Sequence, residues 1–214
     1  MNKLNGKFVT FEGMDTAGKT TIMKMLKDYI ETLPTKNNYV FTREPGSTYS
    51  REAEKIRTLI LDKDNNFPTI VDALLFAAGR RLNLENAVWP ALKENKIVFS
   101  DRYWISSFVY QGILGDAGYD NVKTINLIAT NSTAPDFIVF FDLEPKIVLK
   151  RLANLRNETD RLEHFDLDYY VKLRKAYLNV LQEYKQKVAI IDSSKTLEEM
   201  FQDLLKILKE RELI

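Results

Sequence analysis

Residues 13–20 read Gly13-Met14-Asp15-Thr16-Ala17-Gly18-Lys19-Thr20. The stretch has the spacing G-x-x-x-x-G-K-[ST], which is typical of a loop that surrounds the phosphate groups of a nucleotide. It follows the apolar residues 8–11 and precedes a stretch in which Ile22, Met25, Leu26 and Tyr29 recur at helical spacing. The sequence therefore predicts a strand, a glycine turn and a helix in the order that a phosphate loop requires.

The residue types in this loop match the chemistry of phosphate binding. Gly13 and Gly18 allow backbone turns that side chains disfavour, so that successive N–H groups converge on phosphate oxygens. The first turn of the following helix also attracts anions. We expect Lys19 to bridge the outer phosphates and Thr20 to ligate Mg²⁺. The residues predicted here to surround the phosphates of the nucleotide are Gly13, Met14, Asp15, Thr16, Ala17, Gly18, Lys19, Thr20 and Thr21.

Short apolar stretches alternate with longer helical patterns along the rest of the chain. Strands are predicted at 7–11, 39–42, 96–100, 137–142 and 188–192, each apolar at consecutive positions, as in sheets covered on both faces. Helices are predicted at 22–33, 51–61, 69–94, 120–130, 145–155, 167–183 and 197–208. This order predicts an α/β fold of three layers, α/β/α, with a parallel five-stranded sheet. No linker divides the chain, so we expect one domain over residues 1–214.

Composition excludes several classes of protein. The 31 Lys and Arg residues balance 30 Asp and Glu residues, which argues against binding to nucleic acid mainly through phosphate attraction. There is no cysteine and one histidine, which excludes disulfides, a cysteine nucleophile and multi-histidine metal centres. The longest apolar run, residues 73–78, is too short for a membrane span, and residues 1–6 lack a signal peptide's apolar stretch. We expect a soluble cytoplasmic protein without nucleic-acid or membrane partners.

The phosphate loop alone does not separate kinases from regulatory GTPases. A GTPase needs an Asn-Lys-x-Asp motif that reads guanine, and the sequence has none. An Asp-x-x-Gly match exists at residues 15–18, but it lies inside the phosphate loop and cannot also serve as a switch. The motifs therefore favour a kinase.

Three further clusters stand where ligands bind in open α/β sheets, near strand ends or beside them. They are residues 42–46 (TREPG), residues 101–103 (DRY) with 106–112 (SSFVYQG), and residues 74–80 (LLFAAGR) on the long predicted helix. Arg43, Arg80 and Arg102 could converge on a second anion, while Phe76 and Tyr110 could present apolar faces to a base or sugar. For any one of them alone, a surface ion pair or core packing is the alternative.

Taken together, these segments resemble the thymidylate kinase family from Phe8 to about Glu199. The matching pieces are 11–20, 42–46, 74–80, 101–103 with 106–112, and Ile191-Asp192-Ser193-Ser194. The combination of TREPG with DRY is more specific than the phosphate loop. The resemblance implies a P-loop kinase fold, ATP-dependent phosphorylation of dTMP to dTDP for dTTP synthesis, and a homodimer.

The resemblance also implies an acceptor site. Phe76 would stack on thymine, with Arg80 and Gln111 at its polar edge. Tyr110 would crowd the 2′ position of the sugar, and Asp15 would hold the 3′-hydroxyl. The substrate-binding residues predicted in this way are Asp15, Arg43, Pro45, Phe76, Arg80, Arg102, Ser106, Ser107, Tyr110 and Gln111.

Further roles follow from the same resemblance. Arg102 would bind the acceptor phosphate, and Arg43 would lie close to both phosphate groups. Asp101 would lie near Mg²⁺ and its waters, so the predicted metal residues are Thr20 and Asp101. On the ATP side, Ser193 and Ser194 would pass near adenine, and Arg151 would pack beside it.

Three positions depart from the family's pattern. Ser47 replaces the second glycine that is usual after residues 42–46, so this turn is expected to differ slightly. Gly79 lies in mid-helix, at a cost of about 1 kcal/mol relative to alanine, where the family commonly has a larger residue. Thr16 stands where one branch of the family has a catalytic arginine and another has glycine, with basic residues in a lid segment instead.

Thr16 cannot supply a cation, so the charge that develops on the transferred group needs another donor. The expected source is a lid at about residues 151–165, where Arg156 or Arg161 would close over the phosphates. The alternative for each arginine is a charged helix end or loop. The predicted catalytic residues are thus Lys19, Arg43, Arg102, Arg156 and Arg161.

The sequence keeps two other functions open. One is a kinase for a different nucleoside monophosphate or a deoxynucleoside. The other is a nucleotide-binding regulator that changes conformation without forming a product. The three arginine-bearing clusters favour the enzyme, because a regulator needs no second anion site.

The lid hypothesis is tested by Arg156→Ala and Arg161→Ala. A cation supplied in the closed state contributes about 10³–10⁵ in rate in related chemistry. We expect a large loss of turnover in at least one variant, measured as ADP release. Near-wild-type rates in both variants would refute the hypothesis.

Overall fold

The structure, a computed structural model, describes residues 5–154 and 166–214. The described residues form one parallel sheet in the order β2-β3-β1-β4-β5. The strands are β1 (Lys7–Gly13), β2 (Tyr39–Arg43), β3 (Ile97–Asp101), β4 (Phe137–Asp142) and β5 (Val188–Asp192). All five predicted strands are present, and the predicted α/β class is confirmed. Central β1 extends to Gly13, so the phosphate loop begins directly at the strand's end.

A helix is present in each predicted range, and a further helical segment at residues 104–114 was not predicted. The helices are α1 (Lys19–Glu31), α2 (Arg51–Leu61), α3 (Thr69–Asn83), α4 (Trp89–Lys93), α5 (Trp104–Ser107), α6 (Tyr119–Ala129), α7 (Pro145–Asn154), α8 (Leu167–Leu181) and α9 (Leu197–Glu210). The long helix predicted over 69–94 is one helical run with a π-helical turn, Leu84–Val88, between α3 and α4. A second π-helical segment, Phe108–Leu114, continues α5.

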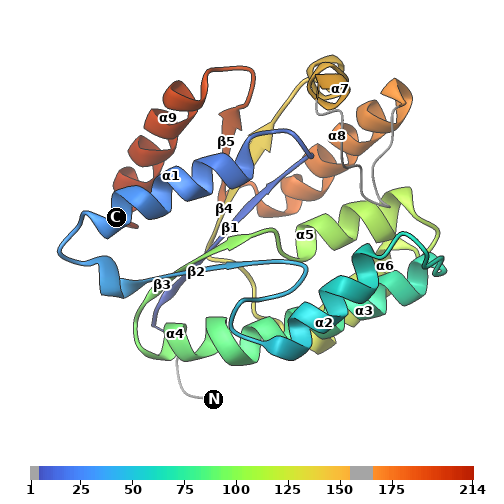
Figure 1. Ribbon diagram of the computed structural model, residues 1–214, viewed down its shortest axis with the longest axis horizontal. Helices are drawn as coiled ribbons and strands as arrows, with labels where there is room; N and C mark the ends of the chain where they lie inside the picture. Colours follow the sequence, from blue (N-terminus) through green and yellow to red (C-terminus); the bar gives the residue numbers. More distant parts are fainter. Residues whose placement is uncertain (1–4, 155–165) are drawn as a thin grey trace.

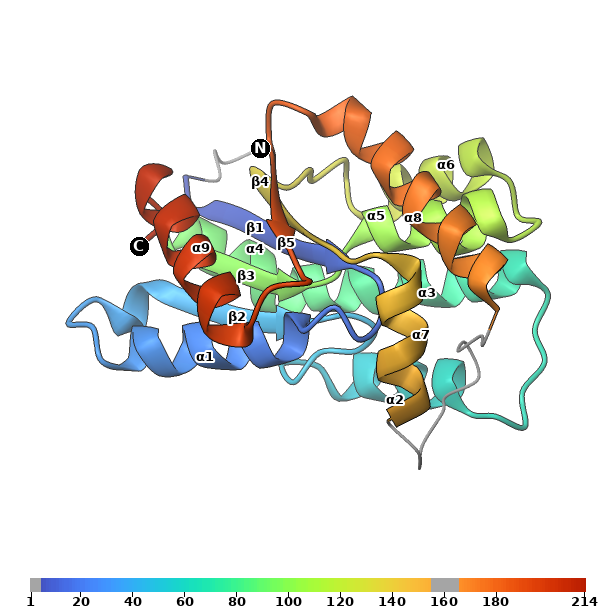
Figure 2. The ribbon, with the colours of Figure 1, turned by 90° about the horizontal axis from the view of Figure 1, so that it is seen from above.

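Helices cover both faces of the sheet, as the buried strands require. On one face α1 packs beside α9, and on the other lie α4, α5 and α8 (Figures 1 and 2). Helices α2, α3 and α6 pack side by side beyond the second face (Figure 1). No described helix combines the length and apolarity needed to cross a membrane.

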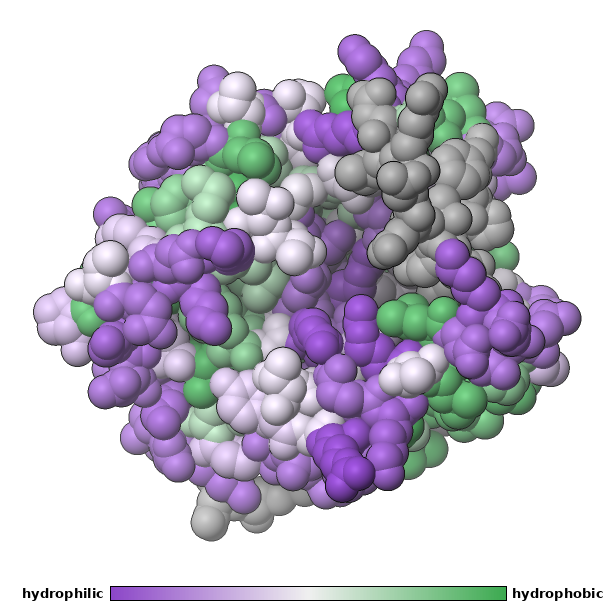
Figure 3. Space-filling view, viewed as in Figure 1, coloured by the Kyte–Doolittle hydropathy of each residue, from purple (hydrophilic) through white to green (hydrophobic). Residues whose placement is uncertain are grey.

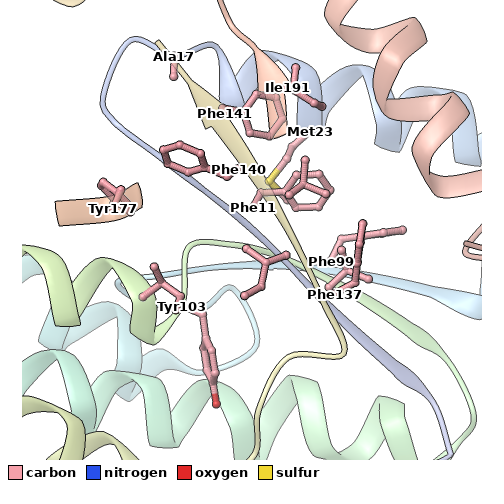
Figure 4. Close-up of a cluster of buried hydrophobic side chains, with 14 of the residues drawn as sticks. Phe11, Ala17, Met23, Phe99, Tyr103, Phe137, Phe140, Phe141, Tyr177 and Ile191 are labelled. Atoms are coloured by element: carbon pink, nitrogen blue, oxygen red, sulfur yellow. The ribbon is translucent and has the colours of Figure 1, made fainter. Parts of the chain in front are cut away.

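The core is aromatic and centres on β1. Phe11 lies 5.8 Å from Phe99 and 6.1 Å from Phe141, measured between ring centroids. In Figure 4, Ile191, the strand partner of Phe141, lies close to it, whereas the Tyr103 ring points away from the strands. Its hydroxyl donates to the Thr133 carbonyl at 2.9 Å. Since β1 is buried from Phe8 to Gly13, its end is held rigidly under the phosphate loop.

Gly79 is not required by its surroundings. A methyl group there would meet only the Cγ2 of Ile56, at an ordinary 3.5 Å. We therefore expect Gly79→Ala to raise the free energy of unfolding by about 0.5–1 kcal/mol, because glycine is costly inside a helix. The measurement is the midpoint of thermal unfolding, which should rise by about 2–4 °C per kcal/mol for a chain of this size.

Gly112→Ala is the matched control for this prediction. Its methyl group would meet the backbone Cα of Tyr119 at 3.2 Å, which is tighter than ordinary packing. That variant should be destabilised. A lower melting temperature for Gly79→Ala would contradict the expectation.

Candidate active site

A cavity of about 790 Å³ opens at the carboxyl ends of the central strands. Figure 3 shows a hollow with hydrophilic walls in the middle of this face. The cavity joins the two sites that the sequence predicted separately. Of the predicted residues, those lining it are Asp15, Thr16, Ala17, Gly18, Lys19, Thr20, Thr21, Arg43, Pro45, Phe76, Arg80, Asp101, Arg102, Ser106, Ser107, Tyr110, Gln111 and Arg151. Gly13, Met14, Ser193 and Ser194 lie outside its lining, and Arg156 and Arg161 lie outside the described residues.

The phosphate loop has the backbone that its glycines allow. Gly18 has φ 86° immediately before α1, and Gly13 has φ 146°. A Cβ on Gly13 would lie 2.6 Å from the Phe141 carbonyl oxygen, so β4 excludes any side chain there. Helix α1 begins without a side-chain cap and without acidic residues in its first turn. Its free N–H groups therefore face the cavity, where they can donate hydrogen bonds to an anion.

Lys19 folds back onto its own loop. Its Nζ donates to the carbonyls of Gly13 at 3.0 Å and Met14 at 2.9 Å. Burial, reinforced by the positive charge of Arg102, lowers the pKa of Lys19 to about 8. The carbonyl contacts hold the ammonium group at the mouth of the loop, where a phosphate can take their place.

Thr20 and Asp101 meet at the end of β3. The Thr20 hydroxyl donates to Asp101 Oδ2 at 3.4 Å, while Asp101 Oδ1 is buried without a partner. Oxygen ligands of this kind suit Mg²⁺, which usually takes one or two carboxylates and completes its shell with water and substrate phosphates. Among the described residues no group of three or more potential metal-ligating side chains occurs. The pair therefore fits a magnesium ion that arrives with a nucleotide.

Arg102 is the most constrained cation in the cavity. It has φ 66°, a conformation uncommon outside glycine. Its Nη2 donates to Asp15 Oδ1 at 2.5 Å, and its Nη1 donates to the Gly13 carbonyl at 3.1 Å. Its guanidinium also lies 5.7 Å from the centre of the Tyr110 ring. Burial opposes the charge of Arg102, but neighbouring Asp15 holds its pKa well above the ordinary value.

Arg80 is a fixed, buried donor. It is 2% exposed, and its Nε donates to Glu44 Oε2 at 2.6 Å. Its remaining nitrogens donate to Asn126 Oδ1 and to Ser107 Oγ. Burial raises the pKa of Glu44, although the charge of Arg80 opposes the shift. Because a guanidinium only donates, the part of it that faces the cavity suits a carbonyl oxygen.

Two further arginines that line the cavity, Arg43 and Arg151, also have partners. Arg43 donates to both carboxylate oxygens of Glu54, at 3.3 and 3.0 Å. Arg151 on α7 donates to the Thr16 carbonyl at 2.8 Å and to the Ser193 carbonyl at 2.9 Å. Arg151 thus ties the phosphate loop to the turn after β5. Ser193 is fully buried and takes part through its backbone.

Two departures noted in the sequence have local explanations. Ser47 is fully buried, its N–H donates to Glu54 at 2.7 Å, and its hydroxyl accepts from the Tyr49 N–H at 3.3 Å. Thr16 has φ 60°, and its carbonyl is the acceptor for Arg151. The serine therefore closes the turn with its own hydrogen bonds.

Sequence reasoning missed the partners of these cations. The direct partners are Glu44, Glu54, Asn126 and Tyr177, and Glu12 acts on Arg102 only through the Ser106 hydroxyl. Glu12 and Glu44 stand inside the quoted motifs, so their positions were available as a signal. Asn126 and Tyr177 lie 46 and 75 residues from the arginines they contact, and no local pattern marks them.

The fold and the cavity define a class. A phosphate loop after the central strand, arginines in the same cavity and a hydroxyl–carboxylate pair whose oxygens suit Mg²⁺ are typical of a P-loop nucleotide kinase. The family model for thymidylate kinase matches residues 11–204. The chain belongs to the thymidylate kinase family.

Individual relatives agree with this assignment. The chain is 43% identical to a thymidylate kinase of Ligilactobacillus salivarius, over 96% of this chain and 98% of the relative. It is 41% identical to one of Finegoldia magna, over 97% and 100%. The crystal structure of the Ehrlichia chaffeensis thymidylate kinase has the same fold, with a TM-score of 0.77 at 24% identity, covering 96% of this chain and 99% of that one.

The lowered pKa of Lys19 predicts how nucleotide affinity depends on pH. Above pH 8 the free protein loses this positive charge, so an anionic nucleotide is attracted less. We expect the affinity for ATP, measured without Mg²⁺ by calorimetry, to fall by up to about tenfold per pH unit above 8. In Lys19→Arg the guanidinium stays charged, and its affinity should remain flat to pH 9.5. Equal slopes in both proteins would contradict the assignment.

Proposed function

We propose that this chain acts as one nucleotide kinase domain over residues 1–214, in which ATP and dTMP meet in the described cavity. Phosphorylation of dTMP to dTDP is the activity of the family. The single observation that supports placing both ATP and dTMP in this cavity is that Lys19 and Arg102 line it together. The two anion-binding centres come from different strand ends, β1 and β3, which are hydrogen-bonded neighbours.

The donor nucleotide binds in the phosphate loop. Its phosphate oxygens replace the Gly13 and Met14 carbonyls as partners of the Lys19 ammonium and accept from the free N–H groups of α1. Thr20 and Asp101 would hold Mg²⁺ beside the outer phosphates. When bound, the ion neutralises charge on the phosphate oxygens of ATP.

The acceptor phosphate exchanges places with Asp15. In the absence of substrate, the Asp15 carboxylate satisfies the Arg102 guanidinium. A phosphate at Arg102 would replace this carboxylate, and Asp15 would then be available to accept from the sugar 3′-hydroxyl. Arg80, fixed by Glu44 and Asn126, presents its donor face to a base carbonyl, which favours thymine over cytosine at this edge.

Chemistry then requires alignment and no general base. An oxygen of the dTMP phosphate, already ionised at neutral pH, attacks the γ-phosphorus of ATP. The bond from that phosphorus to the β,γ-bridging oxygen breaks, and ADP leaves with the electron pair. Lys19, Arg102 and Arg43 stabilise the charge that spreads over the transferred group.

A homodimer is the expected assembly. Helices α2, α3 and α6 lie side by side and expose apolar residues. Among them Leu59 is 42%, Leu74 51% and Ile128 72% exposed. Exposed apolar side chains on adjoining helices are typical of a surface that a second subunit covers.

An acceptor screen tests the substrate assignment. ADP release with ATP and Mg²⁺ should be stimulated by dTMP much more than by dCMP, dGMP or thymidine, with dUMP as the probe of selectivity for the thymine methyl group. Equal stimulation by dCMP would contradict the assignment of Arg80. No stimulation by any acceptor would indicate a regulator.

Lys19→Ala and Arg102→Ala should each lower turnover of dTMP by about 100-fold or more, since each removes a cation at the transferred charge. Circular dichroism and melting should show normal folding. Arg81→Ala is the matched control: Arg81 neighbours Arg80 on α3 but bonds Glu85 and the Ala129 carbonyl outside the cavity. Full activity in a folded Arg102→Ala protein would overturn the acceptor site.

A further inference from the structure

Glu12 is a charged side chain that no step above uses. It is the penultimate residue of β1, directly before Gly13 of the phosphate loop, is 0% exposed and does not line the cavity. Burial raises its pKa to about 7, with Ser106, Arg102, the Tyr103 N–H and Lys19 favouring the anion. Burying an ionised carboxylate costs free energy, so we ask what Glu12 contributes in return.

Both carboxylate oxygens of Glu12 connect to Arg102: one through the backbone that follows it, and the other through its side chain. Oε1 accepts from the Tyr103 N–H at 2.9 Å, the amide that directly follows Arg102. Oε2 accepts from the Ser106 hydroxyl at 2.6 Å. The Ser106 oxygen in turn accepts from Arg102 Nη1 at 3.0 Å.

The direction of these hydrogen bonds is set by the carboxylate. A hydroxyl has one hydrogen, and Ser106 gives it to Glu12, so its oxygen is left as an acceptor for the guanidinium. The Tyr177 hydroxyl on α8 lies 3.0 Å from Ser106 and accepts from Arg102 Nη1 at 3.2 Å. Tyr177 therefore donates to Ser106. Every group in the chain from Glu12 to Arg102 has a defined donor and acceptor role.

We propose that Glu12 is a positioning residue for the acceptor phosphate: one oxygen holds the left-handed backbone at Arg102 through the Tyr103 N–H, and the other holds the guanidinium through Ser106. This inference rests on the proposed role of Arg102. The backbone at φ 66° is strained and needs such support. Other bonds hold the same segment, from the Arg102 N–H to the Phe11 carbonyl at 2.9 Å and from the Ser100 hydroxyl to the Arg102 carbonyl at 2.8 Å. Among the described residues, only Glu12 accepts both from the backbone N–H after Arg102 and from the hydroxyl that holds its guanidinium.

The variant Glu12→Gln separates positioning from stability. Its amide oxygen can still accept from the Tyr103 N–H, but its NH₂ then faces Ser106. The Ser106 hydroxyl must turn its hydrogen away, and the amide NH₂ competes with Arg102 for the Ser106 oxygen. We expect the KM for dTMP to rise at least tenfold, which is about the effect of losing one charge-assisted hydrogen bond. The KM for ATP should stay within twofold of wild type. Because the variant buries no charge, its melting temperature should equal or exceed that of wild type.

The pH profile gives a second readout. Below about pH 7 Glu12 takes up a proton, so kcat/KM for dTMP should fall in the wild type more than in Glu12→Gln, which is already neutral. The titration of dTMP itself contributes equally to both proteins. The charged groups facing Glu12 are Arg102 and Lys19, with Tyr177 as the nearby titratable hydroxyl; β4 contributes apolar Phe140 opposite Glu12 in the strand register.

Asp136→Asn is the matched control. Asp136 accepts from the Phe8 N–H at 2.8 Å, near the other end of β1 and away from the cavity. It should lower stability without changing the KM for dTMP. If Glu12→Gln does not fold, Glu12→Asp, which retracts the carboxylate from its two partners, should give the same rise confined to dTMP.

The outcomes distinguish a failure of the role proposed for Glu12 from a failure of the acceptor site proposed at Arg102. An unchanged KM for dTMP in folded Glu12 variants, while Arg102→Ala is inactive, overturns the role of Glu12 alone. Equal rises in the KM for dTMP and ATP, or a lowered melting temperature with normal kinetics, also overturn it, because both indicate a merely structural role. An active Arg102→Ala protein overturns the acceptor site itself.

Discussion

The parallel pairing of β1 with β3 is the constraint on which the site depends. Phe11 pairs with Asp101, so the phosphate loop and the Asp101–Arg102 segment leave the sheet side by side. Chain segments almost ninety residues apart therefore place Asp15 and Arg102 in contact. A shift of this register by one residue would reverse the faces on which the buried side chains lie and would separate the two anion centres.

Each cation in the cavity already has a partner before substrate arrives. Arg102 has Asp15, Arg43 has Glu54, Arg80 has Glu44, and Lys19 has two backbone carbonyls. Under the proposed function, the charges are thus held near the positions at which they would meet phosphate, and binding would be an exchange of partners. Such an arrangement limits the reorganisation needed at the reacting centre, which is how charged groups contribute most to phosphoryl transfer.

Much of this could be predicted from sequence because the signals are local. The spacing of Gly13, Gly18 and Lys19 fixed the loop, and consecutive apolar residues indicated a covered parallel sheet. The partners that orient the arginines are non-local: Tyr177 reaches Arg102 only because α8 returns across the second face of the sheet. That the packing does not require Gly79 could also be learned only from the structure, since its distance from Ile56 shows that a methyl group has room.

The buried pair of Glu44 and Arg80 limits how this protein can diverge. Both side chains are almost fully enclosed, at 3% and 2% exposed. Replacing either one strands the opposite charge in the interior, at a cost of about 3–5 kcal/mol, which is a large part of the stability of an ordinary domain. A change at one of these two positions therefore requires a compensating change at the other, so Glu44 and the orientation of Arg80 are coupled.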